Sequence, residues 1–157
     1  MKLLPLSYDK FTMIDDEDFE YFNQFRWYYD IGNYAYRRIK TKKIWLHRAL
    51  MKSSKDFVID HIDGNGLNNQ KSNLRICTHQ QNIMNRNKNI GNNKYRGIYT
   101  YPYNPNRWCV SLKRRINNKI IRYRGSTTSE ESAILLYNQK AKEFYGEFAK
   151  LNIIKED

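Results

Sequence analysis

The chain has 157 residues, which is enough for one domain or for two small ones. Its 28 Lys and Arg residues outnumber its 16 Asp and Glu residues, and the formal net charge of +12 favours a polyanionic partner such as nucleic acid. No apolar run reaches the length of a membrane span, and the apolar N-terminal residues are too few for a signal peptide. We therefore expect a soluble, intracellular protein with no membrane partner.

Residues 1–56 are rich in aromatic side chains and predict antiparallel strands around one short helix. A helix is expected after Asp15 or Asp16, because acidic residues complement a helix N-terminus. We interpret this acidic cluster in that way rather than as a metal site. Strands are expected at 11–14, 27–30, 34–39 and 44–46, with turns at 31–33 and 41–43. Their basic side chains either brace DNA or are only solvated: Arg37, Arg38, Lys40, Lys42 and Lys43.

A short helix is expected at 47–52, and a polar segment with short apolar runs follows it. The apolar run Phe57-Val58-Ile59 predicts a buried strand that carries Asp60 and His61 at its end. Since neighbouring side chains of a regular strand point in opposite directions, the strand must end or twist there.

The segment continues with a turn at 63–66 and a second strand at 74–77. Thr78 is a predicted helix N-cap, and Gln81 completes a capping box three residues later. Asn82 would lie near the start of that helix. A strand, loop, strand and helix in this order would bring Asp60, His61 and Asn82 together.

This segment resembles the HNH nuclease motif of phage and intron homing endonucleases, whose fold is a ββα-metal unit. The matching residues are the run from Asp60 to Asn65, Asn73-Leu74 and Asn82, and His47-Arg48 fits the usual lead-in. The resemblance implies a catalytic set of four residues: Asp60, His61, Asn73 and Asn82.

In that set the imidazole of His61 is the general base, because its ordinary pKa lies near neutrality. Asp60 and Asn82 would hold one divalent metal per site, Mg²⁺ or alternatively Mn²⁺, since their oxygens are hard ligands. Asn73 is interpreted as a clamp on the loop. No zinc is expected, because Cys77 and Cys109 are far apart in the sequence and form no CxxC pair.

Residues 85–93 are polar and predict a linker, in which Arg86 and Lys88 would track the DNA backbone. Beyond it, strands are expected at 94–100, 107–113 and 119–125, followed by a helix that Thr128 or Ser129 caps and that ends at Gly146. Between Asp63 and Glu130 the chain has thirteen Lys and Arg residues and no acidic residue. This favours phosphate binding over a merely solvated basic face.

The segment 94–152 is similar to the ethylene-response-factor type of DNA-binding domain (the APETALA-two family). The matching residues include Tyr95-Arg96-Gly97, Arg107-Trp108, Gly125, Ser129 to Ala133 and Leu151-Asn152. That family docks a three-stranded sheet in the major groove, and the resemblance places Arg96, Ser111, Lys113 and Tyr123 on the DNA-facing side. With the basic run, the expected DNA-binding residues are Arg86, Lys88, Arg96, Arg107, Ser111, Lys113, Arg115 and Tyr123.

The sequence thus predicts an α+β chain with a nuclease domain at 1–84, whose ββα-metal core covers about 57–84, a linker at 85–93 and a DNA-binding domain at 94–152. The expected function is site-specific, metal-dependent cleavage of double-stranded DNA by an HNH enzyme of the homing type. A monomer that nicks and a homodimer that cuts both strands remain open. So do two other functions: a DNA-binding regulator with an inactive nuclease domain, and a restriction or defence nuclease.

Overall fold

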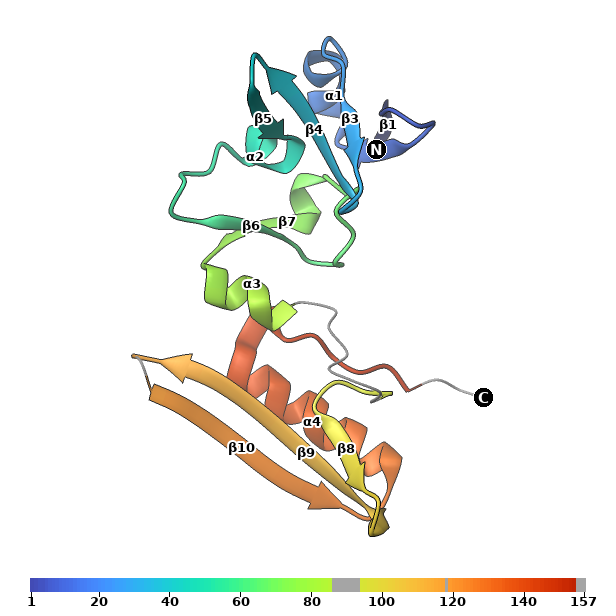
Figure 1. Ribbon diagram of the computed structural model, residues 1–157, viewed down its shortest axis with the longest axis vertical. Helices are drawn as coiled ribbons and strands as arrows, with labels where there is room; N and C mark the ends of the chain where they lie inside the picture. Colours follow the sequence, from blue (N-terminus) through green and yellow to red (C-terminus); the bar gives the residue numbers. More distant parts are fainter. Residues whose placement is uncertain (86–93, 118, 155–157) are drawn as a thin grey trace. The chain divides into compact units, whose positions relative to one another are not determined.

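The computed structural model describes residues 1–85, 94–117 and 119–154, which form small antiparallel sheets and short helices (Figure 1). The expected α+β class is confirmed. The chain divides into two compact units, Met1–Ile83 and Met84–Asp157, and the division falls within helix α3 (His79–Asn85). Arg86, Lys88 and nearly all of the expected linker lie outside the described residues. Within the described parts, no helix is long and apolar enough to cross a membrane.

The first unit opens with a hairpin of β1 (Lys2–Pro5) and β2 (Phe11–Ile14), followed by helix α1 (Asp16–Phe22). A three-stranded antiparallel sheet follows, in the order β3 (Tyr28–Asp30), β4 (Tyr34–Ile39) and β5 (Lys42–Trp45). Helix α2 (Leu46–Met51) ends at Lys52, which has left-handed backbone angles.

The structure adds to the expectations for this unit and corrects one of them. β1 was not predicted, and the second turn lies at residues 40–41 rather than 41–43. The turn is displaced because Lys40 adopts a positive φ of 53°, which lets Lys42 pair with Ile39. The core of the unit joins the hairpin to the later elements, since Leu4, Ile14 and Leu46 are each at most 1% exposed. Burying one such side chain stabilises the fold by about 1.5–3 kcal/mol.

The acidic start of α1 is tied to the segment that precedes β7 (Leu74–Cys77). Asp15 is at the N-cap position, but its side chain makes no capping bond and instead accepts a hydrogen bond of 2.8 Å from the backbone N–H of Lys71. Lys71 Nζ also lies 2.7 Å from Glu17 and 2.8 Å from Asp18. These contacts attach the segment before β7 to helix α1.

The second unit is a three-stranded antiparallel sheet in the order β10 (Lys119–Thr127), β9 (Asn104–Ile116) and β8 (Ile98–Tyr101). Helix α4 (Glu130–Tyr145) packs on one face of the sheet, and a short 3₁₀ turn, η2 (Gly146–Phe148), follows it. The core consists of buried side chains from the sheet, the helix and the segment before β8: Tyr95, Ile98, Val110, Leu112, Ala133, Ile134, Tyr137 and Ala141.

The predicted ends of α4 are confirmed, since the helix ends before Gly146 as expected. Ser129 is the N-cap, and its hydroxyl accepts a hydrogen bond of 3.1 Å from the backbone N–H of Ser132. The expected strand bounds differ from the structure, because β8 begins only at Ile98, whereas β9 begins before Arg107 and continues through Ile116. The residues that follow Lys113 lie outside the predicted strand, but they pair with β10 as far as Ile116.

Candidate active site and nucleic-acid interface

The polar segment of the first unit folds as a hairpin followed by a helix. β6 (Val58–His61) pairs antiparallel with β7, and the register places Asp60 opposite Arg75 and His61 opposite Leu74. Directly opposed side chains share a face and alternate along a strand, so Asp60 and His61 lie on opposite faces. β6 ends at His61. The sequence predicted that the strand would end or twist at these two residues.

Asp60 is 5% exposed and forms a buried ion pair with Arg75. Nε and Nη2 of Arg75 donate to its Oδ2 atom over 2.9 Å and 2.7 Å. Removing a charged carboxylate from water costs free energy, and the ion pair with Arg75 offsets part of that desolvation cost.

Helix α3 begins with the capping box that the sequence predicted. The backbone N–H of Gln81 donates to Thr78 Oγ1 over 3.2 Å, and that of Thr78 donates to Gln81 Oε1 over 2.8 Å. The backbone N–H of Asn82 faces the Cys77 sulfur, which is buried and whose thiol pKa is raised by that burial. Cys77 lies on the same face of β7 as Arg75, so the backbone of Asn82 lies on the Asp60 side of the hairpin.

His61 is 5% exposed, and the surrounding groups restrict its ring. Its Nε2 atom is 3.3 Å from Oδ1 of Asn69, and the ring of Tyr34 lies 5.8 Å away between centroids. Burial lowers the pKa of His61 below 6.5, while the hydrogen bond to Asn69 and the charges of Asp63 and Asp60 oppose that shift. The net direction favours a neutral imidazole near neutral pH, the form that a general base requires.

Asn73 has the side-chain contacts expected of a loop clamp. Its Nδ2 atom donates to the backbone oxygen of Asn68 over 2.8 Å and to Asp63 Oδ1 over 3.0 Å, and its Oδ1 atom accepts from the backbone N–H of Asp63 over 3.1 Å. Asp63 is a turn residue, whose Oδ1 accepts a hydrogen bond of 2.7 Å from the backbone N–H of Asn65. Asn73 therefore holds the loop that follows His61, and its part in the reaction stays a prediction.

Three residues outside the predicted catalytic set lie near His61 or contact a residue that does. His47 was kept out of the catalytic set, yet its ring lies 5.3 Å from that of His61 and stacks on Trp45. Burial, followed by the charges of His61 and Arg48, lowers its pKa to about 3. Asn69, which contacts His61, hydrogen-bonds Thr12 from β2. The His47-Arg48 lead-in was a signal for the first, whereas nothing in the sequence marks Thr12.

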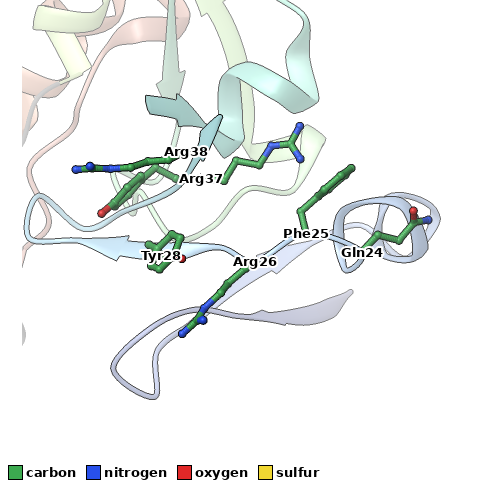
Figure 2. A pocket seen from close by; sticks show the side chains of 7 residues that line it. Gln24, Phe25, Arg26, Tyr28, Arg37 and Arg38 are labelled. Carbon is green, nitrogen blue, oxygen red and sulfur yellow. The ribbon is translucent and has the colours of Figure 1, made fainter. Parts of the chain in front are cut away.

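Figure 2 shows a pocket of about 520 Å³ in the same unit, where β3 begins. It is lined by Gln24, Phe25, Arg26, Tyr28, Tyr36, Arg37 and Arg38, and includes no member of the predicted catalytic set. The guanidinium carbon of Arg37 lies 3.8 Å from the centre of the Phe25 ring, and that of Arg26 lies 5.5 Å from the Tyr28 ring. These two cations are held by aromatic packing, so the pocket alone does not mark a DNA contact.

The outer face of the C-terminal sheet, opposite α4, is basic. Register places Ser111 opposite Arg124 and Lys113 opposite Arg122. Since Val110 and Leu112 are buried against the helix, their neighbours Ser111 and Lys113 point outward, as expected. The outer-face residues of β9 and β10 include Arg107, Ser111, Lys113, Arg115, Arg122 and Arg124, of which the last two were not predicted.

Two residues that the resemblance placed on this face lie elsewhere. Tyr123 is opposite the buried Leu112, packs against Phe144 of α4 and therefore faces the helix. Arg96 precedes β8, and its guanidinium interacts with the hydroxyl of Tyr137 in α4.

Two oxygen donors of the first unit have the chemistry that a divalent cation prefers. Asp60 offers a carboxylate and Asn82 an amide, both suited to Mg²⁺ or Mn²⁺. In the part of the chain that the structure describes, no group of three or more His, Cys, Asp and Glu could hold a metal ion. A cation bound at Asp60 would share that carboxylate with Arg75.

Comparison with known proteins identifies the class and then the family. Residues 52–84 match the family model described as HNH endonuclease, a class of DNA-cleaving hydrolase. Over 158 aligned residues the chain is 32% identical to an uncharacterized HNH endonuclease of Acanthamoeba polyphaga mimivirus, with 97% of this chain and 80% of the relative covered. The chain belongs to the HNH endonuclease family. No solved structure matches it.

Proposed function

We propose that the protein is a site-specific DNA endonuclease of the homing type, which cuts with His61 as general base and one divalent metal held by Asp60 and Asn82. The observation that carries the proposal is the hairpin geometry: a buried imidazole at the end of β6 lies next in sequence to a buried carboxylate on the opposite face. Members of the family generally use a divalent metal.

The reaction requires a water molecule to lose a proton beside a scissile phosphate. His61 would accept that proton at the end of β6, while Asn73 holds the loop that follows it. A bound metal would offset the charge of the phosphate and of the leaving 3′-oxygen. Arg75 orients the Asp60 carboxylate through two hydrogen bonds to its Oδ2 atom.

We further propose that the C-terminal unit binds the DNA target as an ethylene-response-factor-like module, through its outer face. The support is the exposed row of Lys113, Arg122 and Arg124 on two paired strands, with α4 on the other side of the sheet. The proposal assigns DNA binding to residues 94–152 and cleavage to residues 1–84.

The test is cleavage of a supercoiled plasmid that carries DNA from around the gene's insertion site, with Mg²⁺ or with a chelator. The proposal expects relaxed or linear DNA only with the metal. Asp60→Asn, which keeps the shape and an acceptor for Arg75, should abolish that activity, whereas the exposed Asp56→Ala should retain it. No relaxation by the parental protein would favour a regulator with an inactive nuclease domain.

Mapping the cut ends in a genomic library separates the remaining alternatives. Cuts near the gene's own insertion site support homing. Cuts at many sites that are protected in the host support restriction or defence. The ratio of relaxed to linear product reports whether one strand or both are cut.

A further inference from the structure

A chain of buried hydrogen bonds links His61 to the N-terminal hairpin. Thr12 of β2 is fully buried, Asn69 is 1% exposed, and the two are 57 positions apart in the sequence. Thr12 Oγ1 donates to the backbone oxygen of Leu67 over 2.7 Å. A hydroxyl has one proton, so the same oxygen can only accept in its contact with Asn69 Nδ2, which is 2.8 Å long.

These contacts fix the orientation of the Asn69 amide. The second amide proton of Nδ2 goes to the backbone oxygen of Gly66 over 3.2 Å. A flipped amide would place Oδ1 against the Gly66 oxygen and against a hydroxyl oxygen whose proton is already used. Oδ1 must therefore face His61, where it lies 3.3 Å from Nε2.

The backbone makes this arrangement rigid. The N–H of Asn69 donates to the Met13 oxygen over 2.8 Å, and the N–H of Met13 donates to the Leu67 oxygen over 2.8 Å. Strand β2 and the loop are thereby joined by two backbone hydrogen bonds at Met13, the residue that follows Thr12. The hydroxyl cannot turn away without losing a buried hydrogen bond.

We propose that Thr12, acting through Asn69, sets the tautomer of His61: the neutral ring carries its proton on Nε2, and Nδ1 is the atom that takes the proton from water. An amide oxygen can only accept, so the ring nitrogen facing it must donate. Thr12 and Asn69 are positioning residues, and Thr12 lies outside the matched 52–84 segment. The inference rests on the proposed role of His61 as base.

The test uses a matched pair at position 12 in the full chain. Thr12→Ser keeps the hydroxyl, whereas Thr12→Val keeps the shape and removes it. Ring ¹⁵N chemical shifts of labelled protein, recorded without metal or DNA near pH 8, report the tautomer of His61. The parental protein and Thr12→Ser should show an Nε2-protonated ring, and Thr12→Val should show a mixture of both tautomers.

The single-turnover cleavage rates of the variants should change in parallel with the tautomer of His61. Thr12→Val should lose about 10–100-fold, the usual cost of removing a partner that orients a site histidine, and Thr12→Ser should stay within about threefold of the parental rate. A parental ring protonated on Nδ1 overturns the proposal without any variant. An unchanged tautomer in a folded Thr12→Val overturns it as well.

Failure of the proposed function looks different. If His61→Ala cuts at the parental rate, His61 is not the base. The ¹⁵N spectra still decide whether Thr12 sets the tautomer.

Discussion

The loop around His61 and the outer face of the C-terminal sheet are both polar, but they are built in opposite ways. His61, Asp60 and Asn69 are each at most 5% exposed, and each has hydrogen bonds that fix its orientation. Lys113, Arg122 and Arg124 are exposed on a regular ladder. A proton transfer needs groups held in advance in one geometry, whereas attraction to phosphates needs only charge at the surface.

The largest expected effect comes from removing the buried imidazole. His61→Ala should slow single-turnover cleavage by roughly two to four orders of magnitude, because a positioned general base contributes that much. DNA binding by the same variant should persist. His79→Ala is the matched control, since His79 is exposed at the first position of α3 and should cut at the parental rate. Equal losses in both variants would mean that the two histidines do not differ in role.

The exposed face should give a smaller effect that depends on salt. Arg122→Ala or Arg124→Ala should weaken DNA binding, and each should reduce the slope of log affinity against log salt by about 0.9 if it contacts one phosphate. Tyr123→Phe, between them in sequence but facing α4, should change neither quantity. Fluorescence anisotropy at several salt concentrations measures both. If Tyr123→Phe changed the DNA affinity or its salt dependence as much as Arg122→Ala or Arg124→Ala, the outer face of the sheet would not be the DNA-binding face.

The smallest expected effect is a difference in acid sensitivity between the two units. Burial holds the pKa of His61 below 6.5 and lowers the pKa of His47 to about 3. In the unfolded chain both rings titrate near 6.5, so below that pH the unfolded state binds more protons and the free energy of unfolding decreases. All three histidines lie in the first unit.

Lowering the pH from 7 to 5 should therefore reduce hydrogen-exchange protection in residues 1–83 more than in the second unit, after correction for intrinsic rates. The window stops at pH 5 because carboxyl groups begin to titrate below it. His47→Gln should lessen the loss. Equal losses in both units would contradict the assignment of the effect to buried histidines.

Local patterns predicted much of the nuclease unit. The apolar run before Asp60, the capping residues Thr78 and Gln81, and the strand at Leu74–Cys77 all appear where the sequence placed them. Each depends on residues close together in the chain, for which side-chain periodicity and capping chemistry suffice. The Thr12–Asn69 contact joins residues 57 positions apart and depends on tertiary packing, so local sequence patterns could not predict it.

The C-terminal unit shows a different limit, because one residue of register decides a whole face. Tyr123 was placed outward by resemblance, yet Gly125, two residues later, lies where an added Cβ would be 3.2 Å from Leu136 of the helix. Tyr123 must therefore face α4 too. Gly125 and Tyr123 are two positions apart on the same strand and therefore share a face. A glycine in a strand often marks close approach by another element, so Gly125 could have indicated from the sequence that this face packs on the helix.

Chemical rescue tests the central claim, that the imidazole at position 61 takes the proton from water. His61→Gly removes the ring and leaves space beside Asn69 and Tyr34 for a free imidazole. With saturating enzyme and Mg²⁺, its cleavage rate should be low and should rise with imidazole concentration, while His79→Gly should not respond. A His61→Gly protein that cuts at the parental rate without imidazole would contradict the account.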